Sequence, residues 1–336
     1  MGKTFKILTI DGGGIKGLYS AQVLAKMEEK FNCKLSDKFD LICGTSTGAI
    51  LALAVSLKVP MSEAVTFYEQ KGPKIFNQRR KQIPGYSFYL AIKQALISPK
   101  YNSCNLEDAL TEVFGSRTMS DCQNMVCIPA LNINDASCCI FKKDFGTNSR
   151  DNKKTCVDVA LASAAAPTFF PVKEIDDHQY ADGGLYANNP TLVGLLEFIY
   201  KILPQFPEND YDSVDILSVS SCEKASGQKH GRKNKSFWNW KSTLFDAYSQ
   251  GQAKFEAFLL TQIIPHLNFK VNFYRVKNEV LPSEISSLIE LDNASKSSLK
   301  ELKAIGKRTA DNENVKPEVR HFFKTNKTIQ YSYHGK

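Results

Sequence analysis

The sequence predicts an α/β fold in which helices cover both faces of a mainly parallel sheet. Two observations favour this class. Apolar runs of strand length alternate with amphipathic runs of helical length across residues 3–203 of the 336-residue chain. Glycine-rich turns at residues 12–14 and 44–48 follow two of the apolar runs, where the chain must turn sharply from a strand into a helix.

The elements follow from local patterns. Strands are expected at residues 3–10, 39–43, 125–141, 179–181, 214–219 and 269–276, because each is an apolar or strand-rich run. Helices are expected at residues 18–31, 49–57, 61–70, 105–114, 155–166 and 189–203. Ser62 is a start signal for the third of these helices, Pro167 ends the fifth and Pro190 lies in the first turn of the sixth.

The character of the sequence changes after Ser220. Residues 224–241 are rich in Gly, Asn and Lys and predict a flexible loop. A helix at residues 243–264 precedes the last strand, and polar helices are expected near residues 295–304 and 317–323. Because nothing repeats and no long low-complexity linker occurs, one α/β domain with a C-terminal helical elaboration is the simplest architecture.

Composition narrows the class of protein. Hydrophobic residues make up 43% and charged residues 23%, which is ordinary for a globular protein. No run approaches the ~18 apolar residues that a membrane-spanning helix needs, and the first residues lead into a strand without a signal peptide. Gly2 does not indicate myristoylation, because Lys6 stands where that motif has Ser or Thr. We therefore expect a cytoplasmic protein.

The nine cysteines have an odd count and no regular spacing, so they do not predict a disulfide framework. No C-x-x-C motif or Cys/His cluster has the spacing of a zinc site. Neither a metal nor an organic cofactor is expected. The net charge of +8 would allow an anionic membrane or nucleic acid as partner, and it is also compatible with a slightly basic solvated surface. Charge alone does not distinguish these possibilities.

Ser46 is the candidate nucleophile. The pentapeptide Gly44-Thr45-Ser46-Thr47-Gly48 joins an expected strand to an expected helix. A strand, a sharp turn and a helix around G-x-S-x-G are the context of a nucleophile elbow, which presents a serine hydroxyl above a sheet. A side chain at either glycine would crowd that turn. The pentapeptide alone is a weak signal, since small-residue turns are also common at ordinary helix starts.

The segment Asp11-Gly12-Gly13-Gly14-Ile15-Lys16-Gly17 joins the first strand to the first helix. Such a turn bares backbone N–H groups at a helix N-terminus, where negative charge is favoured. A Rossmann dinucleotide site would need an acidic residue about 20 positions on, after a second strand, and only the helical Glu28 and Glu29 are near. An oxyanion hole is the better interpretation, and a turn that serves packing alone is the third.

A serine nucleophile needs a base. The five histidines are His178, His230, His266, His321 and His334, and none stands in a recognisable catalytic context. His178 lies four residues before Asp182. Asp182 is the better candidate base. It ends a short expected strand and is followed by Gly183 and Gly184, which allow a close approach to a neighbouring segment.

Three motifs in order, Asp-Gly-Gly-Gly-x-Lys-Gly at residues 11–17, Gly-x-Ser-x-Gly at 44–48 and Asp-Gly-Gly at 182–184, resemble the patatin-like phospholipases. The segments at residues 164–167 and 188–190 are similar to the family's small-residue turn and post-aspartate helix start. The resemblance implies a three-layer α/β/α fold with a catalytic domain at residues 5–200. Residues 201–336 would complete the α/β fold and add the C-terminal elaboration, with a regulatory role.

The resemblance also implies a lipid acyl hydrolase with a Ser-Asp dyad and no histidine. Ser46 would attack the acyl carbonyl, and Asp182 would take its proton and return one to the leaving alcohol. The N–H groups of Gly12, Gly13 and Gly14 would hold the oxyanion. The residues that would support the motifs are Asp11, Lys16, Gly17, Gly44, Gly48, Gly183 and Gly184. Lys16 would steady the loop or meet lipid phosphate. Because a free aspartate has a pKa of about 3.9, burial or hydrogen bonding must assist this base.

Two segments combine cations with aromatic residues, at 71–90 and at 224–241, and the second holds Trp238 and Trp240. This mixture suits an anionic headgroup region, so the expected partner is the inner face of the membrane, bound peripherally, and not nucleic acid. Solvated charge runs with locally packed aromatic rings are the alternative.

The resemblance further points to bacterial phospholipases of anti-phage defence that cyclic nucleotides switch on. The C-terminal elaboration would bind such an anionic activator between protomers of a homo-oligomer. A lysophospholipase or small-ester hydrolase without nucleotide gating remains open. So does a nucleotide-binding or scaffold protein that has kept the fold and lost catalysis, although the intact Ser46 and Asp182 argue against it.

Overall fold

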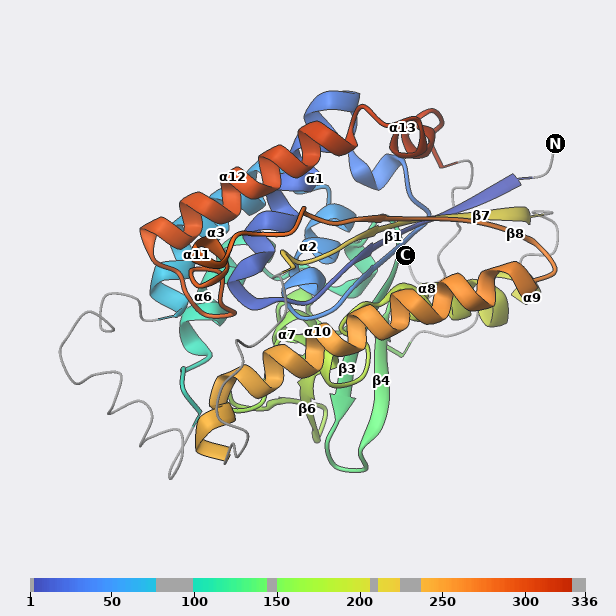
Figure 1. Cartoon of the computed structure of the whole chain (residues 1–336). Coiled ribbons are helices and arrows are strands. Elements are labelled where there is room, and N and C mark those ends of the chain that lie inside the picture. The colour runs from blue at the N-terminus through green and yellow to red at the C-terminus, as the bar shows by residue number, and fades with distance from the viewer. Residues whose placement is uncertain (1–2, 77–98, 144–149, 206–210, 224–236, 328–336) are drawn as a thin grey trace.

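The structure is a computed structural model that describes residues 3–76, 99–143, 150–205, 211–223 and 237–327 (Figure 1). Over these residues eight strands form one sheet in the order β5-β6-β3-β2-β1-β7-β8, with β4 also paired to β3. The parallel pairs join β1 (Lys3–Ile10), β2 (Leu41–Gly44), β3 (Met125–Asn132), β7 (Tyr211–Val219) and β8 (Lys270–Val276). Antiparallel pairs add β4 (Ser137–Lys142), β5 (Lys173–Ile175) and β6 (His178–Asp182).

Helices cover both faces of the sheet. Leu8 and Ile10 point into the larger core, and Phe5 and Ile7 into the smaller one, as the period of two along a strand requires. The larger core packs against α1 (Gly17–Phe31), α2 (Thr47–Ser56), α3 (Met61–Ile75), α6 (Cys104–Phe114), α7 (Cys156–Ser163), α12 (Lys296–Glu313) and α13 (Pro317–Phe323). The smaller packs against α8 (Thr191–Glu197), the π-helical turn η5 (Phe198–Ile202) and α10 (Phe237–Ile263). The mainly parallel, three-layer α/β/α prediction is confirmed (Figure 1).

Some local expectations were wrong. The strand-rich stretch at 125–141 forms the hairpin of β3 and β4, and β5 was not expected. The expected loop at 224–241 is helical from residue 237, where α10 begins. No glycine or proline interrupts residues 237–250, so each added residue extends the helix by one backbone hydrogen bond. Residues 224–236, the rest of that expected loop, lie outside the described residues.

The first cation–aromatic segment, 71–90, is also only partly described. Residues 71–75 continue α3 beyond its expected end at residue 70, and residues 77–98 lie outside the described ranges. Across the described residues no helix is both long and apolar enough to cross a bilayer. No group of three or more His, Cys, Asp or Glu side chains in the same part of the chain is placed to hold a metal ion.

Residues beyond 200 extend the sheet and contribute helices to both of its faces. β7 pairs with β1, β8 pairs with β7, and α12 lies along α1 (Figure 1). Two short helices, α9 (Leu203–Gln205) and α11 (Ser283–Ser286), lie in the same part of the chain. The expected division into a catalytic domain at 5–200 and a remainder at 201–336 stays a prediction.

Close packing of α12 on α1 can be tested with a pair of glycine substitutions. A Cβ added at Gly306 would lie 2.8 Å from the Tyr19 carbonyl oxygen and 2.9 Å from Gln22 Cβ, whereas one added at Gly251 of α10 would meet nothing within 4 Å. Gly306→Ala should lower the free energy of unfolding by about 1–3 kcal/mol. Gly251→Ala should raise it by up to about 1 kcal/mol, since alanine favours a helix. Urea denaturation measures both, and equal stabilisation by the two variants would contradict the packing.

Candidate active site

Ser46 lies in a strained turn between β2 and α2. Its backbone has φ 55° and ψ −121°, a region that residues other than glycine rarely adopt. The glycines on either side explain how the turn closes. A Cβ at Gly44 would lie 2.1 Å from the Gly48 carbonyl oxygen, and one at Gly48 would lie 2.2 Å from the Ile10 carbonyl oxygen. The turn therefore has the geometry of a nucleophile elbow.

A buried serine at the end of α7 holds this turn in place. The Ser46 N–H donates to Ser163 Oγ at 2.9 Å, and the Ser163 hydroxyl donates to the Pro129 carbonyl of β3 at 2.6 Å. An N–H group without a partner at this depth would be costly. Ser163 therefore stabilises the backbone conformation of Ser46, a contact that the sequence did not reveal.

Asp182, at the end of β6, is buried beside Ser46 and is 1% exposed. Burial raises the pKa of its carboxyl group to about 7, while the Gly184 N–H and the Ser46 side chain lower the pKa and only partly offset burial. The Gly184 N–H donates to Oδ1 at 2.7 Å. Within the described residues, Oδ2 has no hydrogen-bond partner of normal geometry, so it can accept a proton. Burial thus supplies the rise in pKa that the expected role of this aspartate as a base requires.

The glycine-rich turn between β1 and α1 borders the same pocket. The Gly12 N–H donates to the Asn188 carbonyl at 3.0 Å, so this donor is already occupied. Among the described residues the N–H groups of Gly13 and Gly14 have no hydrogen-bond partner, and both glycines line the pocket with Ser46 and Asp182. Of the three predicted oxyanion donors, Gly13 and Gly14 are therefore the two that can serve an oxyanion.

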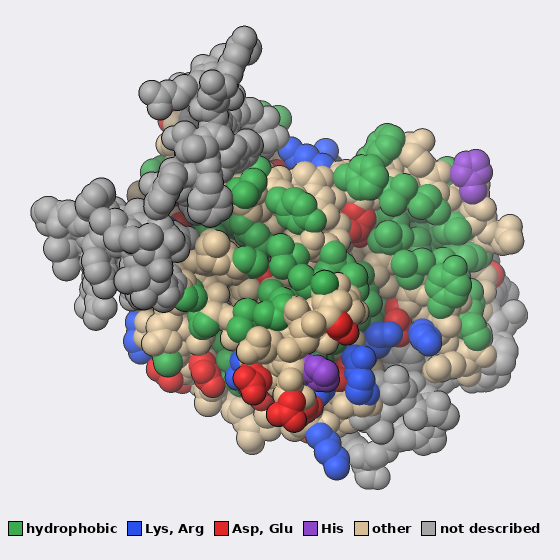
Figure 2. All heavy atoms as spheres, turned by 90° about the horizontal axis from the view of Figure 1, so that it is seen from below, with side chains coloured by type: hydrophobic (Ala, Val, Ile, Leu, Met, Phe, Trp, Pro, Cys, Tyr) green, Lys and Arg blue, Asp and Glu red, His purple; other side chains and the backbone are tan. Residues whose placement is uncertain are grey.

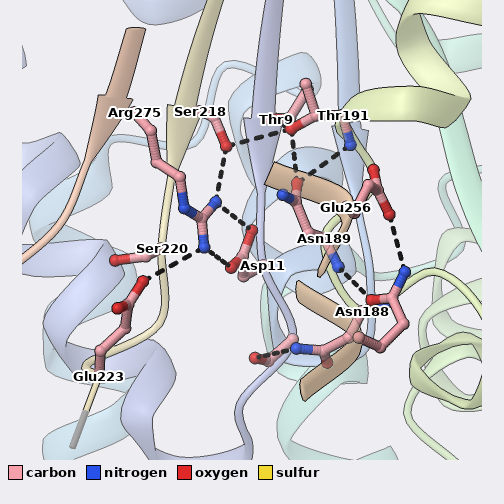
Figure 3. Close-up of polar contacts among 12 residues, drawn as sticks. Thr9, Asp11, Asn188, Asn189, Thr191, Ser218, Ser220, Glu223, Glu256 and Arg275 are labelled. Carbon is pink, nitrogen blue, oxygen red and sulfur yellow. Dashed lines mark hydrogen bonds and ion pairs between the residues drawn. The ribbon is translucent and has the colours of Figure 1, made fainter. Parts of the chain in front are cut away.

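A buried ion pair anchors the start of this turn (Figure 3). Arg275 of β8 donates to both carboxylate oxygens of Asp11, with Nη1 to Oδ1 at 3.2 Å and Nη2 to Oδ2 at 2.6 Å. The same guanidinium donates to Ser218 at 2.9 Å and to Glu223 at 3.4 Å. Burial alone would lower the pKa of Arg275, but the Asp11 carboxylate raises it above its usual range. The ion pair of Asp11 with Arg275 thus joins β8 to the first residue of the glycine-rich turn.

Helix α10 holds the segment that follows Asp182. Gln252 Oε1 accepts the N–H groups of Asn188 and Asn189 at 2.8 and 3.3 Å, and Glu256 accepts the Leu192 N–H at 2.6 Å. Figure 3 shows Asn188, Asn189 and Glu256 close to one another. Burial raises the pKa of Glu256 to about 7, although the bonds from Leu192 and Gln252 lower it. Asn188 in turn contacts the glycine-rich turn at Gly12. The two turns of the site are therefore held to one another and to α10.

Lys16 also reaches α10. Its buried ammonium lies 3.3 Å from Asp246 Oδ1 in an ion pair whose side chains are 2% and 17% exposed. Of the two roles expected for Lys16, steadying the loop is the one that this contact favours. The Ile15 N–H donates to the Leu291 carbonyl at 2.8 Å, which adds a second contact from the C-terminal third of the chain.

The pocket above Ser46 is largely apolar on one side and polar on the other. Its apolar wall comes mainly from α2, α3, α6 and the segment after α7, and includes Ile50, Phe67, Ile75, Phe76, Leu106, Phe169 and Phe170. Its polar wall comes mainly from α10 and includes Asp246, Ser249 and Gln250. A long acyl chain fits the first wall, because burial of its CH₂ groups is favourable at about 0.8 kcal/mol each.

The histidines do not contribute to this pocket in the described part of the chain. His178, His266 and His321 are described and none lines the pocket, while His230 and His334 lie outside the described residues. His321 instead contacts Asp215 at 2.8 Å. The arrangement around Ser46 is thus that of a serine beside a carboxylate, which can carry out acyl transfer.

The chain is similar to known proteins over nearly its whole length. The family model described as patatin-like phospholipase matches residues 8–195. A "cGAMP-activated phospholipase" of Pseudomonas aeruginosa is 30% identical over 335 residues, covering 99% of this chain and 96% of that protein. Proteins of the same name from Escherichia coli and Vibrio cholerae are 31% and 34% identical, covering 91% and 95% of this chain and 88% and 94% of their own lengths.

The anchoring of the glycine-rich turn can be tested through the charge of Arg275. Arg275→Met should lower the free energy of unfolding by about 3–5 kcal/mol, because it leaves the Asp11 carboxylate buried without its counter-charge. The double variant Arg275→Met/Asp11→Asn should recover much of that loss, since it removes both charges. Urea denaturation compares the two. A double variant no more stable than Arg275→Met would show that the pair does not act through charge.

Proposed function

The chain belongs to the patatin-like phospholipase family, and on this premise we propose that it hydrolyses fatty acyl esters of membrane glycerophospholipids. One observation carries the proposal: Ser46, in a strained elbow, lies beside the buried Asp182, whose pKa is raised to about 7. The apolar wall of the pocket supports a long acyl chain as the group that is transferred. No metal or organic cofactor takes part in the proposed reaction.

The reaction proceeds through an acyl-enzyme. Ser46 Oγ attacks the ester carbonyl carbon while Asp182 Oδ2 takes the hydroxyl proton, and the N–H groups of Gly13 and Gly14 stabilise the oxyanion that forms. The tetrahedral intermediate then expels the lysophospholipid alcohol, which leaves with the proton from Asp182. Water attacks the acyl-Ser46 ester with Asp182 as the base again, and the fatty acid is released. The resting enzyme is thereby restored.

Regulation is the second part of the proposal. Three relatives are named as cGAMP-activated, and we propose that a cyclic nucleotide also activates this protein, in anti-phage defence and through its C-terminal part. This part contacts both turns of the active site: Asp246 binds Lys16, and Gln252 binds the backbone of Asn188. A ligand that shifts α10 would therefore move the oxyanion donors and the turn that follows the base. The activated form is proposed to be a homo-oligomer.

The dyad is tested by lipid product analysis with cyclic di- and trinucleotides added in turn. The wild type should release fatty acid from phospholipid vesicles, most strongly with one of the nucleotides. Ser46→Ala should abolish release, and Asp182→Asn should lower it by about 10²–10⁴-fold, since a neutral amide cannot act as the base. Asp177→Asn, which makes the same change at an exposed carboxylate, is the matched control and should leave the rate unchanged.

Two results would contradict these assignments separately. Near wild-type release by Asp182→Asn would remove Asp182 from the mechanism. Release that does not respond to any of the nucleotides would contradict the proposed activation and leave the dyad standing.

The pH dependence follows from the buried base. Asp182 must be ionised to accept the proton, and its pKa is about 7. Below that value each pH unit should lower kcat/KM about tenfold, because the protonated fraction grows as pH falls. An ordinary aspartate, with a pKa near ~3.9, would keep the rate constant down to about pH 5. A short-chain soluble ester is the suitable substrate, and a profile flat between pH 5 and 7 would contradict this role of burial.

A further inference from the structure

Large apolar side chains are exposed along one face of the molecule. Six of them are between 41% and 69% exposed and belong to α10 and to α8 with η5: Leu244, Tyr248, Phe255, Phe258, Leu196 and Tyr200. On α10 they recur after four, seven, eleven and fourteen residues, counting the exposed Gly251, so they share one side of the helix. Figure 2 views the molecule from the side of α10 and shows hydrophobic side chains gathered across it. A patch of this kind marks an interaction surface.

The apolar surface continues from α10 onto its neighbours. A shallow groove between β4, α8, η5 and α10 is lined by Ile140, Leu192, Val193, Leu196 and Tyr200, among others. The stripe on α10 from Leu244 to Phe258 extends over about 21 Å at 1.5 Å per residue. The face is therefore long and broad enough to lie flat against a surface.

The same helix forms a wall of the active-site pocket. Phe245, Asp246, Ser249 and Gln250 line that pocket, whereas Leu244 and Tyr248 are exposed on the adjacent side of α10. A partner that covers the exposed side would therefore lie beside the pocket that receives the acyl chain.

Charges on these elements have a consistent arrangement. Among residues 189–205 and 244–263 the carboxylates are turned inward or paired. Glu197 is 6% exposed and binds Lys142, Asp246 binds Lys16, and Glu256 is 4% exposed. Lys201, a cation of the same segments, is exposed. The face thus presents aromatic and aliphatic side chains with positive charge and no exposed carboxylate in those two ranges.

We propose that this face, formed by α10, α8 and η5, docks on an anionic phospholipid bilayer, an inference that rests on the proposed phospholipase function. Phenylalanine and tyrosine side chains enter the boundary between headgroups and acyl chains, and the exposed Lys201 meets anionic headgroups. A second copy of the chain is the poorer occupant. Two copies of the face would place the exposed Lys201 of each copy in the contact, with no exposed carboxylate of residues 189–205 or 244–263 to pair it, and would cover the side of α10 that adjoins the active-site pocket.

Docking in this manner gives α10 two roles at once. Its outer side would hold the enzyme on the bilayer, and its inner side lines the pocket that contains Ser46. A phospholipid would then pass directly from the membrane along α10 to Ser46, without crossing bulk water. The proposed contact differs from the cation–aromatic segments at 71–90 and 224–241, most of whose residues lie outside the described part of the chain.

Vesicle binding by an inactive variant tests the surface without depending on catalysis. Ser46→Ala is mixed with vesicles of phosphatidylethanolamine and phosphatidylglycerol, or of phosphatidylcholine alone, and the bound fraction is measured by co-sedimentation with and without cyclic nucleotides. Adding Phe255→Ser and Phe258→Ser should weaken binding at least about tenfold, since both side chains lose their apolar contact with lipid. Adding Lys201→Gln should weaken binding to the anionic vesicles alone.

The matched control uses exposed apolar residues elsewhere. Val280→Ser and Val315→Ser, at positions 83% and 56% exposed outside this face, should leave binding unchanged. In the background with Ser46 intact, Phe255→Ser/Phe258→Ser should hydrolyse a soluble short-chain ester at the wild-type rate, which shows that the fold is intact.

Three results would overturn the docking surface. The first is unchanged vesicle binding by the Phe255→Ser/Phe258→Ser variant, and the second is no binding of Ser46→Ala to either vesicle under any condition. The third is a Phe255→Ser/Phe258→Ser variant that still binds vesicles but has lost oligomers in analytical ultracentrifugation. The last result would assign the face to a second copy of the chain. Failure of the phospholipase proposal is seen separately, as a wild type that releases no fatty acid from phospholipid vesicles or as release that survives Ser46→Ala.

Discussion

Backbone packing where β1 and β2 end is the constraint on which the rest of the site depends. Ile10 and Gly44 are neighbours in the parallel pair, and Gly48 at the start of α2 approaches the Ile10 carbonyl so closely that a Cβ would lie 2.2 Å from its oxygen. This contact brings the turn of Ser46 and the glycine-rich turn to one point at the edge of the sheet. β3 lies next to β2 and pairs with β6, which places Asp182 beside them.

The part of the chain after residue 195, where the family match ends, completes this arrangement. Arg275 anchors the glycine-rich turn through Asp11, and Gln252 holds the turn after Asp182. Lys16 and Asp246 join the first helix of the chain to α10. An element that touches both turns, lines the pocket and carries an exposed apolar side is well placed to couple the proposed membrane contact and the proposed activator binding to the active site.

Local patterns in the sequence predicted the strand–turn–helix units, because turns and amphipathic periods depend on neighbouring residues. They predicted Ser46, Asp182 and the glycine-rich turn for the same reason. The partner of Asp11 could not be predicted, since Arg275 is 264 positions away and nothing local marks their pairing. The helical start of α10 was missed because its polar, lysine-rich surroundings resemble a loop, although no glycine or proline interrupts residues 237–250.

Ser46 is the proposed nucleophile, activated by its place in the elbow. Mass-spectrometric mapping of the peptide labelled by a fluorophosphonate probe tests it most directly, because the probe reacts covalently with an activated serine. The adduct should lie on Ser46 in the wild type and be absent from Ser46→Ala. An adduct on another pocket serine, such as Ser221 or Ser249, would contradict the claim, as would a wild type that does not react at all.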